Sequence, residues 1–128
     1  MKSYTSLAQS KKLAQILPLE SADMWWAWYS SPFDNGHYDN FPMFSKPVCN
    51  PDESVPCWSL AALLGVIPQE LFGGEYIINI TEGTNYKWII SYEPQAPDEI
   101  SSYIDASSDN LIDCCVKIIL KLKDRNIL

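Results

Sequence analysis

Only one residue type that titrates near neutral pH, histidine, offers a candidate acid–base catalyst in this chain. His37 is the only histidine, and it lies in a polar stretch between Asp34 and Asp39. A histidine titrates near neutral pH, and an adjacent carboxylate can poise it as a general base, so a hydrolase centred on His37 is one hypothesis. The same stretch is typical of a solvated loop, and no serine or cysteine nucleophile is fixed by its spacing. We therefore name no catalytic residue, and the pattern favours a protein that is not an enzyme.

The four cysteines are Cys49, Cys57, Cys114 and Cys115. Tetrahedral structural metal sites normally show two cysteines separated by two to four residues, and no such pair is present. The acidic residues near His37 likewise lack the spacing of a calcium loop. The sequence predicts no metal site and no cofactor, and it favours buried thiols in a reducing setting.

Aromatic side chains are the best candidates for ligand binding. The chain has five tryptophans and seven tyrosines, and three tryptophans fall within four residues of each other at positions 25, 26 and 28. Exposed rings can stack on a sugar, a base or a proline-rich peptide. We take Trp25, Trp28 and Tyr38 as the candidate ligand-binding residues. The alternative is that the rings fill the core, and consecutive Trp25 and Trp26 in a strand must point to opposite sides.

Charge is distributed unevenly along the chain. Residues 21–110 contain two lysines and thirteen acidic residues, a net charge of −11, whereas residues 1–20 and 111–128 each carry about +2. An acidic body repels phosphates, so we do not expect direct nucleic-acid binding, and a basic protein partner fits this field better. An acidic mimic of DNA remains a further hypothesis. The N-terminus lacks the apolar core of a secretory signal and no apolar run reaches a membrane span, so we expect a cytoplasmic protein with no membrane partner.

The elements that must position these residues follow from periodicity and from helix and turn signals. Ser6 and Gln9 form a capping-box pattern that predicts a short helix over residues 6–17. Aromatic density predicts a strand over 24–29, and five prolines predict a long irregular loop over 30–56. Ser59 is placed to cap a leucine-rich turn of helix. Alternating apolar residues predict a β-hairpin over 76–92, followed by a connection over 93–108.

The last twenty residues predict an amphipathic helix, with Ser108 or Asp109 as its cap. Its apolar side needs an apolar partner, and the hairpin supplies one. We therefore predict an α+β fold, a single small domain spanning residues 1–128, in which an antiparallel hairpin-based sheet is packed by the C-terminal helix and a short N-terminal helix is added. The expected core is Leu63, Leu64, Ile78, Ile80, Trp88, Ile90, Ile112, Cys115, Val116 and Ile119.

Three segments carry a resemblance to known sequences. They are TSLAQSKKLAQILPLESADMWW from Thr5, PCWSLAALLGVIP from Pro56 and SDNLIDCCVKIILKLKDRNIL from Ser108. Together they resemble small uncharacterised proteins of bacteriophages, prophages and mobile elements of gut Bacteroidetes. The resemblance implies a genomic context and transfers no catalytic residue.

The expected function rests on two grounds: the resemblance, and the lack of residues spaced as in a catalytic site. We expect a non-enzymatic accessory protein of a phage or mobile element that binds an unknown protein partner. The alternative is small-ligand or carbohydrate binding through an exposed aromatic patch.

Overall fold

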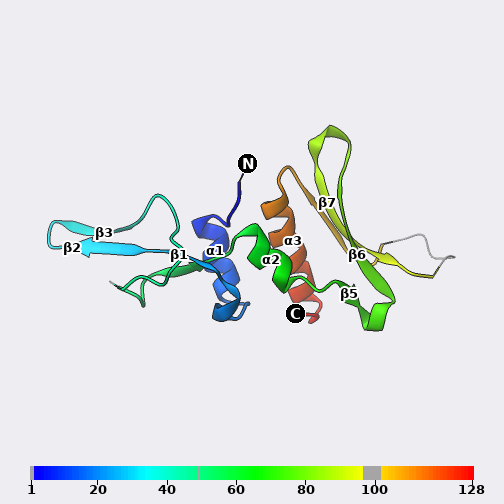
Figure 1. Ribbon diagram of the computed structural model, residues 1–128, viewed down its shortest axis with the longest axis horizontal. Coiled ribbons are helices and arrows are strands. Elements are labelled where there is room, and N and C mark those ends of the chain that lie inside the picture. The colour runs from blue at the N-terminus through cyan, green and yellow to red at the C-terminus, as the bar shows by residue number, and fades with distance from the viewer. Residues whose placement is uncertain (1, 49, 97–101) are drawn as a thin grey trace. The chain divides into compact units, whose positions relative to one another are not determined.

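The computed structural model describes residues 2–48, 50–96 and 102–128 (Figure 1). Its helices and antiparallel sheets confirm the predicted α+β class. The chain divides into two compact units, Ser3–Ala62 and a second unit made of Lys2 and Leu63–Leu128. A single domain over the whole chain stays a prediction.

The N-terminal unit begins with helix α1 (Leu7–Ala14). The predicted capping box is confirmed: the Ser6 hydroxyl accepts from the Gln9 backbone N–H at 3.2 Å, and the Gln9 side chain accepts from the Ser6 N–H at 3.0 Å. The helix ends earlier than predicted, and the chain continues through turns to a short 3₁₀ helix, η1 (Leu19–Ser21).

Two small antiparallel ribbons complete this unit. Strand β1 (Met24–Trp26) pairs with β4 (Val55–Cys57), and β2 (Trp28–Ser31) pairs with β3 (Asp34–Tyr38). The predicted strand over 24–29 is therefore two strands, and the prediction of an irregular loop over 30–56 was wrong for β3 and β4. The turn at Pro32 and Phe33 joins β2 to β3 directly, and Pro56 is accommodated in β4 because this ribbon has only two strands.

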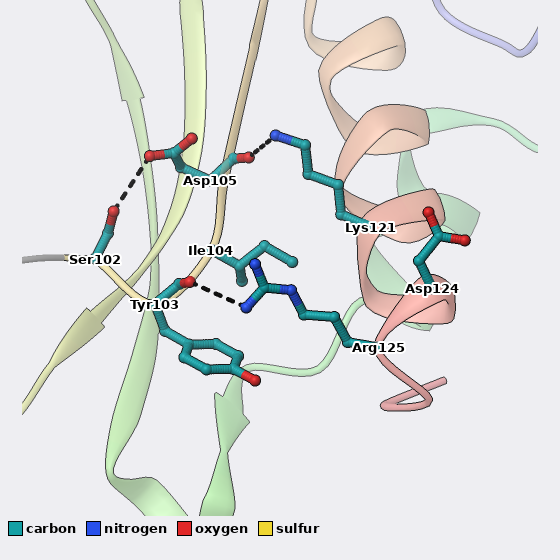
Figure 2. Close-up of a pocket in the computed structure, with 7 residues that line it drawn as sticks. All are labelled: Ser102, Tyr103, Ile104, Asp105, Lys121, Asp124 and Arg125. Carbon is teal, nitrogen blue, oxygen red and sulfur yellow. Dashed lines mark hydrogen bonds between the residues drawn. The ribbon is translucent and has the colours of Figure 1, made fainter.

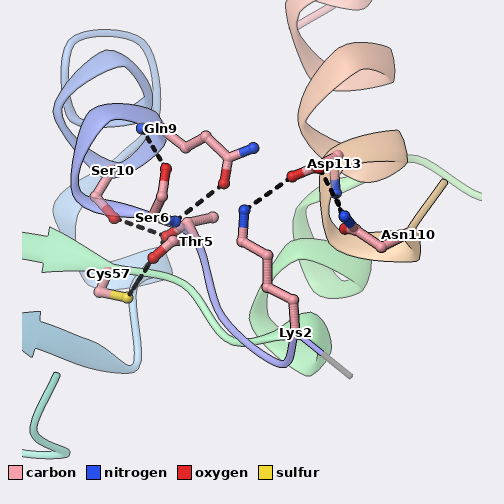
Figure 3. Close-up of polar contacts among 8 residues, drawn as sticks. All are labelled: Lys2, Thr5, Ser6, Gln9, Ser10, Cys57, Asn110 and Asp113. Atoms are coloured by element: carbon pink, nitrogen blue, oxygen red, sulfur yellow. Dashed lines mark hydrogen bonds and ion pairs between the residues drawn. The ribbon is translucent and has the colours of Figure 1, made fainter. Parts of the chain in front are cut away.

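Buried polar groups tie α1 to β4 in the N-terminal unit (Figure 3). The Thr5 hydroxyl lies 2.7 Å from the Ser10 hydroxyl and accepts from the Trp58 backbone N–H at 3.1 Å. The Trp26 indole N–H donates to the Ser10 hydroxyl at 3.2 Å. Thr5 and Ser10 are fully buried, so each of these bonds satisfies a group that water cannot reach.

The second unit contains a four-stranded antiparallel sheet of order β5-β6-β7-β8. Helix α2 (Leu60–Val66), which Ser59 caps as predicted, runs across the boundary between the units. The strands are β5 (Glu70–Leu71), β6 (Tyr76–Glu82), β7 (Trp88–Pro94) and β8 (Asp105–Ser108), with 3₁₀ turns η2 (Phe72–Gly74) and η3 (Thr84–Tyr86) on either side of β6. The predicted hairpin is confirmed as β6 and β7. The predicted connection over 93–108 was wrong in two places, because β7 continues to Pro94 and β8 adds a strand; residues 97–101 lie outside the described residues.

Helix α3 (Leu111–Asp124) packs against β7 and β8 (Figure 1). Its cap is Asn110, one residue later than the nearer of the two predicted caps, and the Asn110 side chain accepts from the Asp113 N–H at 2.9 Å. Lys2 forms an ion pair of 2.9 Å with Asp113 on the same first turn (Figure 3). The helix thus covers one face of the sheet, as its apolar periodicity predicts.

Most of the predicted core is buried, with two corrections. Leu63, Ile90, Ile112, Cys115, Val116 and Ile119 are buried. Leu64 and Ile80 were wrong, since each is more than a third exposed, and Ile78 and Trp88 are partly buried. Ile80 lies on a strand whose neighbour β5 is only two residues long, so nothing in the sheet covers its outer side. In the part of the chain that the structure describes, no helix combines the length and apolar composition that a membrane span requires.

Candidate binding surface

The structure brings together two of the three predicted ligand-binding residues. Trp28 and Tyr38 are cross-strand neighbours in β2 and β3, and their rings pack edge to face with centroids 4.7 Å apart. The Trp28 indole lies over Gly36, where a Cβ would come within 2.2 Å of it, and Lys11 Nζ lies 5.0 Å from the Tyr38 ring centroid. Neighbouring groups therefore pack against both rings, and the two rings are not coplanar. Their role in ligand binding stays a prediction.

Trp25 is placed apart from this pair. Met24 and Trp26 are buried and Trp25 between them is partly exposed, which confirms that Trp25 and Trp26 point to opposite sides of the strand. Trp25 bridges to Met43, and Lys46 Nζ lies 5.4 Å from its ring centroid. Among the described residues, no ring contact joins Trp25 to Trp28 or Tyr38.

Apolar side chains that the sequence did not single out are the most exposed ones in the N-terminal unit. The relative exposure is 98% for Phe33, 71% for Phe41, 82% for Phe44 and 95% for Val48, and Tyr29 is also exposed. All five belong to residues 29–48, which we call the exposed segment. Exposed apolar side chains concentrated in one region of a protein commonly mark an interaction site. Sequence reasoning missed them because it assigned ligand binding to the tryptophans.

His37 belongs to the exposed segment and has an aromatic neighbour. It pairs across the hairpin with Tyr29, and the two rings lie 6.0 Å apart in a tilted arrangement. Among the described residues, no cluster of three histidine, cysteine or acidic side chains is close enough to hold a metal ion.

The thiols of Cys57, Cys114 and Cys115 are buried, and burial favours their protonated form. Burial raises the pKa of all three, and it raises the pKa of Cys115 to about 12. A thiolate is the nucleophilic form of cysteine, so these thiols are protonated in the folded protein. Cys49 lies outside the described residues.

A shallow pocket of about 380 Å³ lies in the second unit between α3 and the chain that leads into β8 (Figure 2). Its wall carries two cations and two carboxylates. Lys121 donates to the Asp105 backbone oxygen, and Arg125 Nη1 donates to the Tyr103 backbone oxygen at 3.4 Å. The Arg125 guanidinium also lies over the Tyr103 ring at 4.9 Å.

The Tyr103 ring belongs to a cluster with Phe72 and Tyr76. The ring centroids lie 5.2 Å apart for Phe72 and Tyr103 and 5.1 Å apart for Tyr76 and Tyr103. Phe72 has a φ of +54°, a conformation that is strained for a bulky residue. Neither the pocket nor this cluster could be found from the sequence, because their residues lie up to 23 positions apart in the pocket and up to 31 in the cluster and carry no spacing signal.

Comparison with known proteins identifies no relative: no protein-family model, curated protein or solved structure matches the chain.

Proposed function

We propose that the protein is a non-enzymatic accessory protein of a bacteriophage, prophage or mobile element, and that it binds another protein through the exposed segment. The observation that carries the proposal is the near-complete exposure of Phe33, Phe44 and Val48 within sixteen residues of chain. Burying one such side chain in an interface removes it from water and gains roughly 1.5–3 kcal/mol before the costs of association. Large apolar side chains of this kind are the usual anchor residues of an interface.

The charges around these side chains favour a basic partner. Residues 29–48 contain Asp34, Asp39 and a single lysine, Lys46, and the following residues Asp52 and Glu53 are exposed. Acidic residues within and next to the exposed segment favour a complementary basic surface and speed its encounter. The genomic context comes from the sequence resemblance alone.

The experiment compares one variant inside the exposed segment with one variant outside it. The double variant Phe33→Ser/Phe44→Ser removes two anchors, and Leu19→Ser removes an exposed apolar side chain of the same unit outside the exposed segment. A photo-crosslinking residue at position 33 or 19, in cells of the native host, then reports what lies against each site.

We expect the same protein to be captured repeatedly at position 33 and not at position 19. Because position 33 is itself changed in the double variant, the crosslinker is placed at position 41 for the comparison of variants. With the crosslinker there, the double variant should lose the captured protein, whereas the wild-type chain and Leu19→Ser should retain it. Equal capture at positions 33 and 19, or none at either, would refute binding through the exposed segment.

Small-ligand or carbohydrate binding is the second candidate, and the pocket beside Arg125 is the observation that favours it. Its mixed charges and its hydroxyl from Ser102 could bind the hydroxyls of a sugar. A thermal-shift screen of mono- and disaccharides tests it. Stabilisation that is lost in Arg125→Met would support it, and an unchanged melting temperature across the screen would remove it.

A further inference from the structure

The two edges of the four-stranded sheet differ in whether other groups cover their outward backbone N–H and C=O. Edge strands present rows of unpaired N–H and C=O groups that can pair with another chain, and proteins usually block them. In an antiparallel sheet, alternate residues direct both backbone groups to the same side. The described backbone hydrogen bonds therefore tell which residues face outward on each edge.

On the β8 edge, α3 covers the outward carbonyl oxygens. The Tyr92 N–H donates to the Ile104 oxygen, so residues 104, 106 and 108 face β7 and residues 105 and 107 face outward. The Tyr103 N–H also donates to the Tyr92 oxygen of β7, and only the Tyr103 carbonyl oxygen faces outward, toward Arg125. Lys117 donates to the Ser107 oxygen. Lys121 donates to the Asp105 oxygen and Arg125 to the Tyr103 oxygen (Figure 2). Four helical residues rise about 6 Å and two strand residues about 6.6 Å, so one row of the helix matches alternate carbonyls of the strand.

On the β6 edge, the outward groups beyond β5 have no such cover. The Ile78 N–H donates to the Gln69 oxygen across to β5, and the Gly83 N–H donates to the Lys87 oxygen across to β7. Residues 78, 80 and 82 therefore face outward, and residues 79, 81 and 83 face β7. Strand β5 does not continue along this edge, because Ile67, the residue that would lie opposite Ile80, donates its N–H to the Leu63 oxygen at the end of α2. Within the described part of the second unit, no group is hydrogen-bonded to the outward N–H or C=O of Ile80 or Glu82.

We propose that this edge of β6 binds an extended basic segment of another protein by strand addition. Such a strand would form up to about four backbone hydrogen bonds with Ile80 and Glu82. It would also cover the Ile80 side chain, which is 36% exposed on the same face as α3.

The charge of the sheet indicates which kind of strand binds at the β6 edge. Strands β5 to β8 carry Glu70, Glu82, Glu93 and Asp105 and no basic residue, so a lysine or arginine opposite Glu82 is favoured. A second copy of this chain is disfavoured, because its β6 brings another Glu82 and the whole chain carries a net charge of −7. The site shares no residue with the exposed segment, so it stands or fails independently of the proposed function.

The test uses a blocked eight-residue peptide that alternates lysine and valine, with amide hydrogen exchange of the full chain measured by NMR. At saturating peptide we expect the exchange of the Ile80 and Glu82 amides to slow at least tenfold. The Asn79 and Thr81 amides already face β7 and should change less than twofold. Control peptides carry glutamate in place of lysine, or proline in place of valine, and neither should protect the two amides.

Variants locate the site on one edge of the sheet. Ile80→Pro removes an outward N–H from the β6 edge, and Ser107→Pro removes one from the β8 edge as its matched control. We expect the first to weaken peptide binding at least tenfold and the second to leave it unchanged. Glu82→Lys, which keeps every backbone group, should weaken binding of the lysine peptide and favour the glutamate peptide, so the test survives if Ile80→Pro does not fold.

Three results would overturn the proposal. The first is a saturating titration that leaves the Ile80 and Glu82 amides unprotected. The second is protection of the Asp105 and Ser107 amides in their place. The third is a dimer of the free protein in sedimentation, with Ile80 and Glu82 already protected, which would assign this edge to a second copy.

Discussion

Replacing Thr5 with valine tests whether the buried hydroxyl network holds the N-terminal unit together. Valine has nearly the shape of threonine, so the change removes an oxygen and leaves the packing volume almost intact. The Trp58 backbone N–H, which is buried and donates to the Thr5 hydroxyl at 3.1 Å, would lose its acceptor. The Ser10 hydroxyl would lose its neighbour at 2.7 Å.

The expected cost comes mainly from the orphaned N–H. Leaving a buried donor unsatisfied costs about 1–3 kcal/mol, whereas an exposed threonine-to-valine change stays within about 0.5 kcal/mol. Thr81 is exposed on β6 and provides the matched control, Thr81→Val. We therefore expect the free energy of unfolding to fall by about 1–3 kcal/mol for Thr5→Val and to stay nearly constant for Thr81→Val.

Urea unfolding followed by tryptophan fluorescence is the suitable assay, because Trp25, Trp26, Trp28 and Trp58 all lie in the N-terminal unit. The slope of free energy against urea should not change, since the variant exposes the same surface when it unfolds. A double-mutant cycle with Ser10→Ala should show coupling of about 0.5–3 kcal/mol, because the two hydroxyls are in direct contact. A Thr5→Val protein as stable as the wild type would show that the network is not what joins α1 to β4.

Two further predictions concern the second unit. Ile119→Ala should lower the free energy of unfolding by about 2–5 kcal/mol, since Ile119 is fully buried, whereas Ile80→Ala should cost about 1 kcal/mol or less because Ile80 is partly exposed; urea unfolding of both variants checks this. Burial raises the pKa of Cys115 from 9.0 to about 12 and that of Tyr92 from 10.0 to about 12. Both groups are neutral when folded and ionise more easily when unfolded, so the stability they contribute is complete below pH 9 and is lost as the pH rises toward 12. The urea midpoint should fall over that range, and it should fall less in Cys115→Ala; a midpoint independent of pH between 9 and 12 would contradict the sign.

Elements whose signals are local could be predicted from the sequence. The capping box of α1 needs only residues 6–9, and the β6–β7 hairpin shows its period of two within seventeen residues. The apolar periodicity of α3 also predicted that the helix must cover a sheet face. In each case the physical cause lies within one turn or one pair of strands.

Elements that depend on distant partners could not be predicted. Strand β8 has the sequence Asp-Ala-Ser-Ser, which carries no strand preference, and it forms because β7 pairs with it on one side and α3 donates to it on the other. Strand β3 contains an Asn-Gly pair that is typical of a turn. In the structure Gly36 lies inside the strand with a φ of +103°, a conformation that favours glycine. The Trp28 indole also occupies the space that a side chain at this position would need.

The candidate site shows the same division. The sequence could identify aromatic residues but not their exposure, so it selected Trp28 and Tyr38, which pack on one another. Phe33 and Phe44, at a hairpin turn and in the following loop, are exposed because nothing in their own unit packs on them. Burial is decided by the partners that a side chain meets, and one residue's type does not contain that information.

The basic residues of α3 connect the fold to the proposed edge site. A lysine-rich C-terminal turn by itself is explained by the helix dipole, which favours cations there. That explanation does not account for the four-residue spacing of Lys117, Lys121 and Arg125, which the alternate carbonyl oxygens of the β8 edge do explain. If the β8 edge is covered and the β6 edge is open, another strand can be added only at β6. The sheet can then accept one partner strand at β6 without growing further at β8, which is how a small protein can present an open edge and avoid assembling into fibres.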